Sequence, residues 1–206
     1  HPEAALANEL HPPPPWRPAL CPLQFLGPCS FLARDTLSGY FKERLIDMAC
    51  YDLEEEPLAS CFCAACRADF CRGLGLSSPL SQREIAERRE GDWVAYRTRT
   101  HRKVLELFRA ILRETAPGAK LSVYSAYESD VAALSSGTSW SLYHDLVDVG
   151  MAGYGRSPSI IARTRAAFGA RPLVLGEPLD CDLFAGVYVR QQARKPILWR
   201  RVVDGG

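Results

Sequence analysis

The chain has 206 residues, of which 47% are hydrophobic and 24% are charged, and these ordinary globular values predict one folded unit with a buried core. Lys and Arg total 25 against 24 for Asp and Glu, giving a formal net charge of +1, and the lack of a basic stripe or arm argues against a nucleic-acid partner. No apolar run approaches the roughly 18 residues that cross a bilayer, and the N-terminal stretch lacks the basic and apolar regions of a signal peptide. We therefore expect a soluble chain with no membrane partner, in a compartment that the sequence does not indicate.

Proline dominates the N-terminal segment, residues 1–29, in which four prolines stand in a row. Because proline lacks an amide donor and has a fixed φ, this segment is expected to be a loop or linker rather than a helix. Ser30 can cap a helix over 31–43, in which apolar side chains recur roughly at helical spacing. Residues 30–206 are therefore expected to form the folded domain.

The first predicted strand covers residues 45–53 and leads into three consecutive glutamates at 54–56. A cysteine-rich insert at 57–79 follows. Asp92 is a natural N-cap for the helix with the clearest apolar stripe, and Ala-Pro-Gly at 116–118 ends that helix.

Strands and helices alternate over the rest of the chain, with strands expected at 121–127, 146–151 and 172–176. A short helical segment is expected around 140–143, and a further helix is expected to begin at Ser157 or Ser159 and to run through Phe168. This alternation implies right-handed βαβ units and a parallel sheet with active groups at the carboxyl ends of its strands. Two architectures fit: an open, doubly wound sheet of four strands, or part of an eight-stranded barrel. A complete barrel takes about 250 residues, so the chain has room for only part of one.

Acidic side chains follow the first and fourth predicted strands. Strand side chains alternate between faces, so Asp52 and Glu54 point the same way. Glycoside hydrolysis needs two carboxyl groups, about 5–5.5 Å apart when a covalent intermediate forms and wider when water attacks directly. Glu54 and Glu177 could supply this pair, with Asp52 in support. The alternative is that 54–56 form a solvated acidic turn and that Glu177 lies in an ordinary Gly-Glu-Pro turn.

Cys61, Cys63 and Cys66 follow the pattern C-x-C-x-x-C. Three thiolates so close together can converge on one tetrahedral ion, for which zinc is the default, and Cys21 and Cys71 are both candidates for the fourth ligand. Four sulfur ligands leave no open position for substrate or water, so a bound zinc would be structural. The alternatives are disulfides, if the protein is secreted, or a cluster of free thiols.

Tyr127, Glu128, Trp140 and Tyr154 lie near predicted strand ends or in the loops that follow them. Aromatic faces at such positions often stack on sugars, so this group of residues is a candidate for substrate binding. Core packing is the alternative for the aromatic members.

Two stretches together resemble a known family. Ala-Leu-Cys-Pro at 19–22 precedes a helix and an acid-ended strand, and Ser-Cys-Phe-Cys-Ala-Ala-Cys-Arg-Ala-Asp-Phe follows at 60–70. This arrangement looks like the middle of the glycoside hydrolase family 42 β-galactosidases, in which a Cys-Pro and a C-[YF]-C-x-x-C-x-x-x-F segment bind a structural zinc. The resemblance implies that the zinc ligands are Cys21, Cys61, Cys63 and Cys66.

The same resemblance implies an α/β fold of the glycosidase TIM-barrel type, partial here, with the fourth to seventh strands visible. It makes Glu54 the catalytic acid/base and Glu177 the nucleophile. The sequence Asp52-Leu-Glu54 is closer to the Asp-x-Glu of chitinase-like barrels, in which the Asp orients the acid. We therefore expect an O-glycosyl hydrolase acting on a carbohydrate substrate. The alternative is a catalytically inactive, zinc-stabilised carbohydrate-binding or interaction domain with the same topology.

Overall fold

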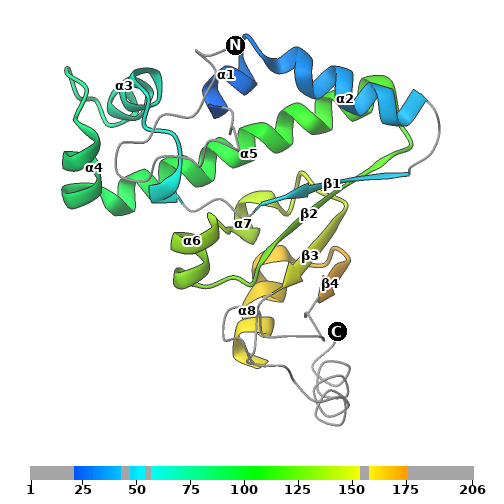
Figure 1. The fold of residues 1–206 in the computed structure, drawn as a ribbon. Helices are drawn as coiled ribbons and strands as arrows, with labels where there is room; N and C mark the ends of the chain where they lie inside the picture. Colours follow the sequence, from blue (N-terminus) through cyan, green and yellow to red (C-terminus); the bar gives the residue numbers. More distant parts are fainter. Residues whose placement is uncertain (1–20, 43–46, 54–56, 154–157, 176–206) are drawn as a thin grey trace, which may run out of the picture.

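The computed structural model describes residues 21–42, 47–53, 57–153 and 158–175. Helices and strands alternate along most of this part of the chain (Figure 1). Of the helices in these ranges, none combines the length and apolar character that a membrane crossing needs. In chain order the elements are α1 (Pro22–Leu26), α2 (Ser30–Lys42), β1 (Met48–Asp52), η2 (Pro57–Ala59), α3 (Ala64–Gly73), α4 (Gln82–Arg88), α5 (Glu90–Thr115), β2 (Lys120–Ala126), α6 (Asp130–Ser136), α7 (Trp140–Tyr143), β3 (Val149–Gly153), α8 (Pro158–Phe168) and β4 (Leu173–Leu175).

The four strands β1 to β4 form one parallel sheet, and their order in the sheet is their order in the chain. Tyr51 of β1 pairs with Val123 of β2, Val123 pairs with Gly150 of β3, and Gly150 pairs with Leu173 of β4. The helices between successive strands supply the long crossovers that parallel pairing requires. The expectation of βαβ units in a parallel sheet is therefore confirmed.

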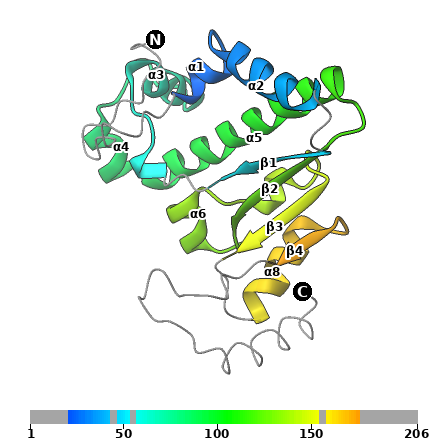
Figure 2. The same cartoon turned by 45° about the vertical axis from the view of Figure 1, so that its right-hand side comes forward.

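The expectation of a partial TIM barrel is wrong, because the described strands form a small open sheet (Figure 2). A barrel closes only when its first and last strands pair, and this type of barrel does so with eight strands. In the described part of the chain β1 pairs with β2 alone and β4 with β3 alone. Alternating strands and helices predict parallel neighbours, whereas closure depends on strand number and tilt. The fold class is thus α/β with an open, four-stranded parallel sheet.

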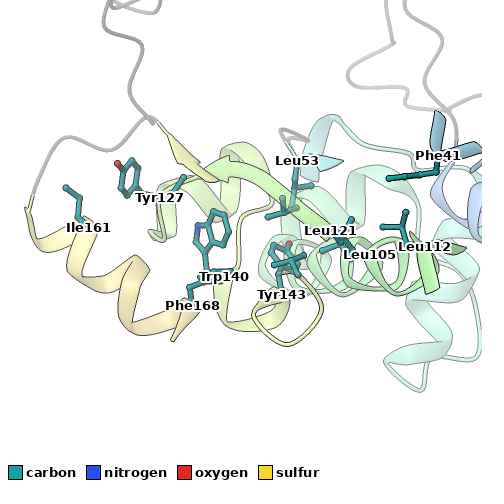
Figure 3. Packing of buried hydrophobic residues seen from close by; sticks show 13 residues of the cluster. Phe41, Leu53, Leu105, Leu112, Leu121, Tyr127, Trp140, Tyr143, Ile161 and Phe168 are labelled. Atoms are coloured by element: carbon teal, nitrogen blue, oxygen red, sulfur yellow. The ribbon is translucent and has the colours of Figure 1, made fainter. Parts of the chain in front are cut away.

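The main core lies on the face of the sheet that α5, α7 and α8 cover. Side chains alternate along a strand, so Leu121 and Val123 of β2 share this face, and both are buried. Right-handed crossovers between strands in sequential order place their helices on the same face. The other buried members of this core are Phe41, Leu53, Leu105, Leu112, Tyr127, Trp140, Tyr143, Val147, Ala152, Ile161 and Phe168 (Figure 3).

A second, smaller hydrophobic cluster surrounds the first turns of α5, where α3 and α4 also gather (Figure 1). Trp93 and Tyr96 of α5 belong to this second cluster, whereas Leu105 and Leu112 of the same helix belong to the main core. The 26-residue helix α5 therefore carries two separate apolar clusters along its length. The buried members of the second cluster are Cys21, Cys61, Phe62, Cys66, Phe70, Cys71, Ile85, Trp93 and Tyr96.

Two short helices, α1 and α4, were not expected from the sequence. Residues 22–26, inside the proline-rich segment, form α1, and Pro22 stands in its first turn, where a missing amide donor costs nothing. Helix α4 begins with a capping box: Ser81 accepts the N–H of Glu84, and the Glu84 carboxylate accepts the N–H of Ser81 at 2.8 Å. Its sequence signature, Ser-x-x-Glu, is readable without the structure.

Candidate metal centre

Four cysteines from separate segments of the chain meet in the second cluster. Cys21 immediately precedes α1, Cys61 follows η2, Cys63 caps α3 and Cys66 lies in the first turn of α3. Their four sulfur atoms all lie within 4.8 Å of one another, and this set can hold a metal ion. The set coincides with the ligands that the family resemblance implied.

The local sequence explains how two of the four sulfurs, those of Cys63 and Cys66, converge. Cys63 stands at the N-cap of α3, and its sulfur accepts the backbone N–H of Cys66 at 3.5 Å. This spacing brings the side chain before the helix and the side chain in its first turn to the same end of the helix. Hydrogen bonds from backbone N–H groups to sulfur also favour the thiolate form that binds metals.

The sulfur–sulfur distances fit a metal site and exclude disulfides within the cluster. Cys21 Sγ lies 3.5 Å from Cys66 Sγ and 3.7 Å from Cys63 Sγ. A disulfide needs about 2.05 Å. Four thiolates at about 2.3 Å from a tetrahedral zinc lie about 3.8 Å apart. The two distances from Cys21 are therefore close to the edge of that tetrahedron, and no described cysteine is in a disulfide.

The surroundings of the four sulfurs are largely closed to solvent. Cys21, Cys61 and Cys66 are 0% exposed. Hydrogen bonds from Cys61 and Cys66 lower the pKa of the Cys21 thiol and outweigh its burial, whereas hydrogen bonding to Cys21 and Cys61, together with burial, raises the pKa of the Cys66 thiol. Several thiolates buried together would repel one another, and a bound cation would offset that negative charge.

Aromatic rings form one wall of the site. Phe62, between two of the cysteines, stacks on Trp93 with ring centroids 4.2 Å apart, and Phe70 meets Trp93 edge to face at 5.0 Å. The indole N–H of Trp93 donates to the carbonyl of Pro57 at 3.0 Å. These contacts attach the cysteine-bearing segments to α5.

Cys71 lies in the same cluster but is not one of the four converging cysteines. Its sulfur accepts the backbone N–H of Leu80 at 3.3 Å. Arg67 also contacts this segment, because its guanidinium donates to the carbonyls of Phe62 and Leu80 at 3.0 and 3.1 Å. Of the two candidates for the fourth position, the structure selects Cys21.

The predicted catalytic carboxylates are only partly within the described residues. Asp52 is exposed at the carboxyl end of β1, on the face of the sheet opposite to Leu53. Glu54 and Glu177 lie outside the described residues. The carboxylate pair of the glycosidase hypothesis stays a prediction.

Three of the four candidate substrate-binding residues are described, and these three make packing and capping contacts. Tyr127 and Trp140 are buried in the main core, and the Trp140 indole donates to the carbonyl of Ala126 at 2.8 Å. The Glu128 carboxylate accepts the backbone N–H of Trp140 at 2.6 Å; burial raises its pKa, although this hydrogen bond opposes the rise. Tyr154 lies outside the described residues. A role of these residues in sugar binding stays a prediction.

Sequence reasoning missed two buried polar residues of α5, Arg97 and His101, which are 0% and 2% exposed. They are four positions apart and so lie on one face of the helix. The sequence shows this spacing but does not show that the two side chains are buried. Their burial depends on the tertiary packing of α5, which contacts the main core along one part of its length and the second cluster along another.

The sequence matches no protein-family model, and no curated protein matches it either. The family resemblance therefore depends on the cysteine and acidic motifs alone. What the chain does has to be inferred from the chemistry of its own residues.

Proposed function

We propose that this chain is a zinc-stabilised α/β domain that binds one Zn²⁺ through the thiolates of Cys21, Cys61, Cys63 and Cys66. The observation that carries the proposal is the meeting of these four sulfurs within 4.8 Å, although Cys21 is distant in sequence from the rest. All-sulfur tetrahedral sites bind zinc or iron, and zinc is the usual ion of structural sites.

The role of the ion in this proposal is structural. Four thiolate ligands fill the tetrahedron, so neither water nor substrate has a position on the metal. The ligands join the chain before α1, the segment after η2 and the start of α3, and the apolar cluster that supports them is small. Metal binding would then contribute folding free energy to this part of the molecule.

The test is the metal content of matched cysteine variants, measured by elemental analysis after purification under reducing conditions. We expect one zinc per chain in the wild type and in Cys71→Ser, which alters a buried cysteine of the same cluster outside the ligand set. We expect the zinc content of Cys21→Ser to fall at least tenfold. Zinc content of Cys21→Ser equal to that of the wild type would contradict the proposed ligand set, and iron in place of zinc would contradict the choice of metal.

Glycoside hydrolysis is the second candidate function. The observation that favours it is that the converging cysteines are those which the resemblance to family 42 glycosidases assigned to a structural metal. In this proposal Glu54 is the acid/base, Glu177 the nucleophile and Asp52 the residue that orients the acid at the carboxyl end of β1. The substrate would be a carbohydrate.

This second candidate is tested with Glu54→Gln and Glu177→Gln on a panel of aryl glycosides. Each variant should lose most turnover, whereas Glu114→Gln, an exposed carboxylate of α5 paired with Arg34, should keep it. Equal turnover in all variants would remove the assignment. If the wild type cleaves no glycoside but binds oligosaccharides, the chain is instead a carbohydrate-binding domain, the alternative weighed from the sequence.

A further inference from the structure

A hollow of about 260 Å³ opens where α5 ends and β2 begins. Its lining includes the turn at 117–119, Arg109 and Arg113 from the last turns of α5, and Lys120, the first residue of β2. Asp148, just before β3, completes its polar lining. The hollow lies at the amino end of the sheet, about 30 Å along α5 from Trp93 of the metal centre, and so is separate from it.

One of the three cations in the hollow already has a partner. The guanidinium of Arg109 donates two hydrogen bonds to the Asp148 carboxylate, one of them at 3.1 Å. The same carboxylate accepts the backbone N–H of Leu121 at 2.9 Å. Burial opposes ionisation of Asp148, but these hydrogen bonds outweigh it and hold its pKa below the usual value. Asp148 is therefore a carboxylate whose charge is matched by Arg109.

The other two cations have no such partner. Among the described residues, Arg113 and Lys120 form no ion pair with a carboxylate, and both are exposed at the hollow. The lining thus carries an excess of two positive charges. The carboxyl end of α5 supplies the equivalent of only about half a negative charge. Arg109 and Arg113 are also four positions apart on one helix, a spacing at which like charges repel.

We propose that this hollow binds a phosphate group, either free phosphate or a small phosphate monoester, through Arg113 and Lys120, with Arg109 fixed beside them by Asp148. A dianion would neutralise the excess charge of the lining. The planar guanidinium of arginine matches two phosphate oxygens at once, and lysine adds a point charge. The hollow is smaller than the roughly 300–1,000 Å³ of pockets for drug-sized ligands, which suits a phosphate head group. The near-neutral chain has no basic stripe to follow a nucleic-acid backbone.

The experiment is isothermal titration of the full, metal-loaded chain with inorganic phosphate and, separately, with glycerol 3-phosphate, at constant ionic strength set by sodium chloride. We expect saturable binding of at least one of these probes. The double variant Arg113→Gln/Lys120→Gln should bind it at least tenfold more weakly. The control is Arg165→Gln, which removes an exposed arginine from the last turn of α8 and should bind as the wild type does.

Tighter binding of glycerol 3-phosphate assigns the hollow to a phosphate monoester, and equal affinity for the two probes assigns it to free phosphate. The absence of saturable binding for both probes, or unchanged affinity in the double variant, would overturn the proposal. Because zinc content is measured on the same samples, these outcomes stay distinct from a failure of the zinc site.

Discussion

The sulfur atoms of Cys21 and Cys66 lie 3.5 Å apart, although 45 positions separate these residues in the chain. The described residues between them form α1, α2, β1, η2 and the start of α3. Bringing such distant segments together has an entropic cost, and a metal ion bound by both offsets it only in the folded state. A metal ion held at this contact would therefore couple its binding directly to folding.

Removal of the metal is expected to unfold the second cluster before the main core. At a free zinc concentration 100 times the dissociation constant, a site of this kind contributes about 2.7 kcal/mol to the free energy of unfolding. A chelator should therefore lower the melting temperature and, in hydrogen exchange, expose the amides of 58–80. The amides of β2 and β3 should stay protected. Equal loss of protection in both regions would show that the two clusters unfold as one unit.

Two buried tryptophans offer a matched pair for testing how the metal centre is supported. Trp93 donates to the carbonyl of Pro57 in the second cluster, and Trp140 donates to the carbonyl of Ala126 in the main core. Replacing either by Phe removes one hydrogen bond and part of the ring, at a cost of about 1–3 kcal/mol in unfolding free energy. Only Trp93→Phe should also weaken zinc binding, measured by competition with a metal indicator. A similar loss of affinity in Trp140→Phe would argue against a local effect.

Gly150 of β3 is expected to tolerate no larger side chain. A Cβ at this position would lie 2.8 Å from the Trp140 ring, 2.9 Å from Leu173 and 3.0 Å from Phe168. Overpacking of this kind typically costs about 1–3 kcal/mol, so Gly150→Ala should lower stability by that amount in denaturant titrations. Gly39→Ala is the control, because a Cβ there meets nothing within 4 Å on the exposed face of α2 and should raise stability slightly. Equal effects of the two changes would contradict the close packing at β3.

Acid is expected to weaken the attachment of α5 to the start of β3 through Asp148. Its pKa is lowered in the folded chain, so its stabilising contribution is complete above the unfolded value of about 3.9 and is lost as the pH falls through the lower folded value. Asp148→Asn should cost about 1–2 kcal/mol at neutral pH.

The measurement is the free energy of unfolding between neutral pH and about pH 2 for the wild type and the Asp148→Asn variant. The two curves should converge at the acid end. Asp35→Asn, at an exposed position of α2, serves as the control and should follow the wild type. Parallel curves for Asp148→Asn and the wild type would rule out the proposed titration.

Local pattern was enough to predict much of the secondary structure and three of the four cysteines of the candidate metal site. Alternating apolar strands and helices predict parallel pairing, and the C-x-C-x-x-C spacing places three sulfurs around the start of one helix. The sequence analysis did not predict helix α4, although the spacing Ser81-x-x-Glu84 is the sequence signature of its capping box. The periodicity, the cysteine spacing and the capping box each relate residues only a few positions apart in the chain. The backbone conformation strongly restricts how the side chains of such residues can be arranged.

The sequence by itself determined the helices and strands with clear periodicity, the parallel direction of the strands and the clustering of Cys61, Cys63 and Cys66. Only the tertiary structure decided that the sheet is open, that Cys21 completes the cysteine set in place of Cys71, and that Arg113 and Lys120 share a hollow with Asp148. The physical reason is the range of the interactions. Helix and strand periodicity relates residues within one element, whereas sheet closure, ligand convergence and charge balance depend on how separate elements pack.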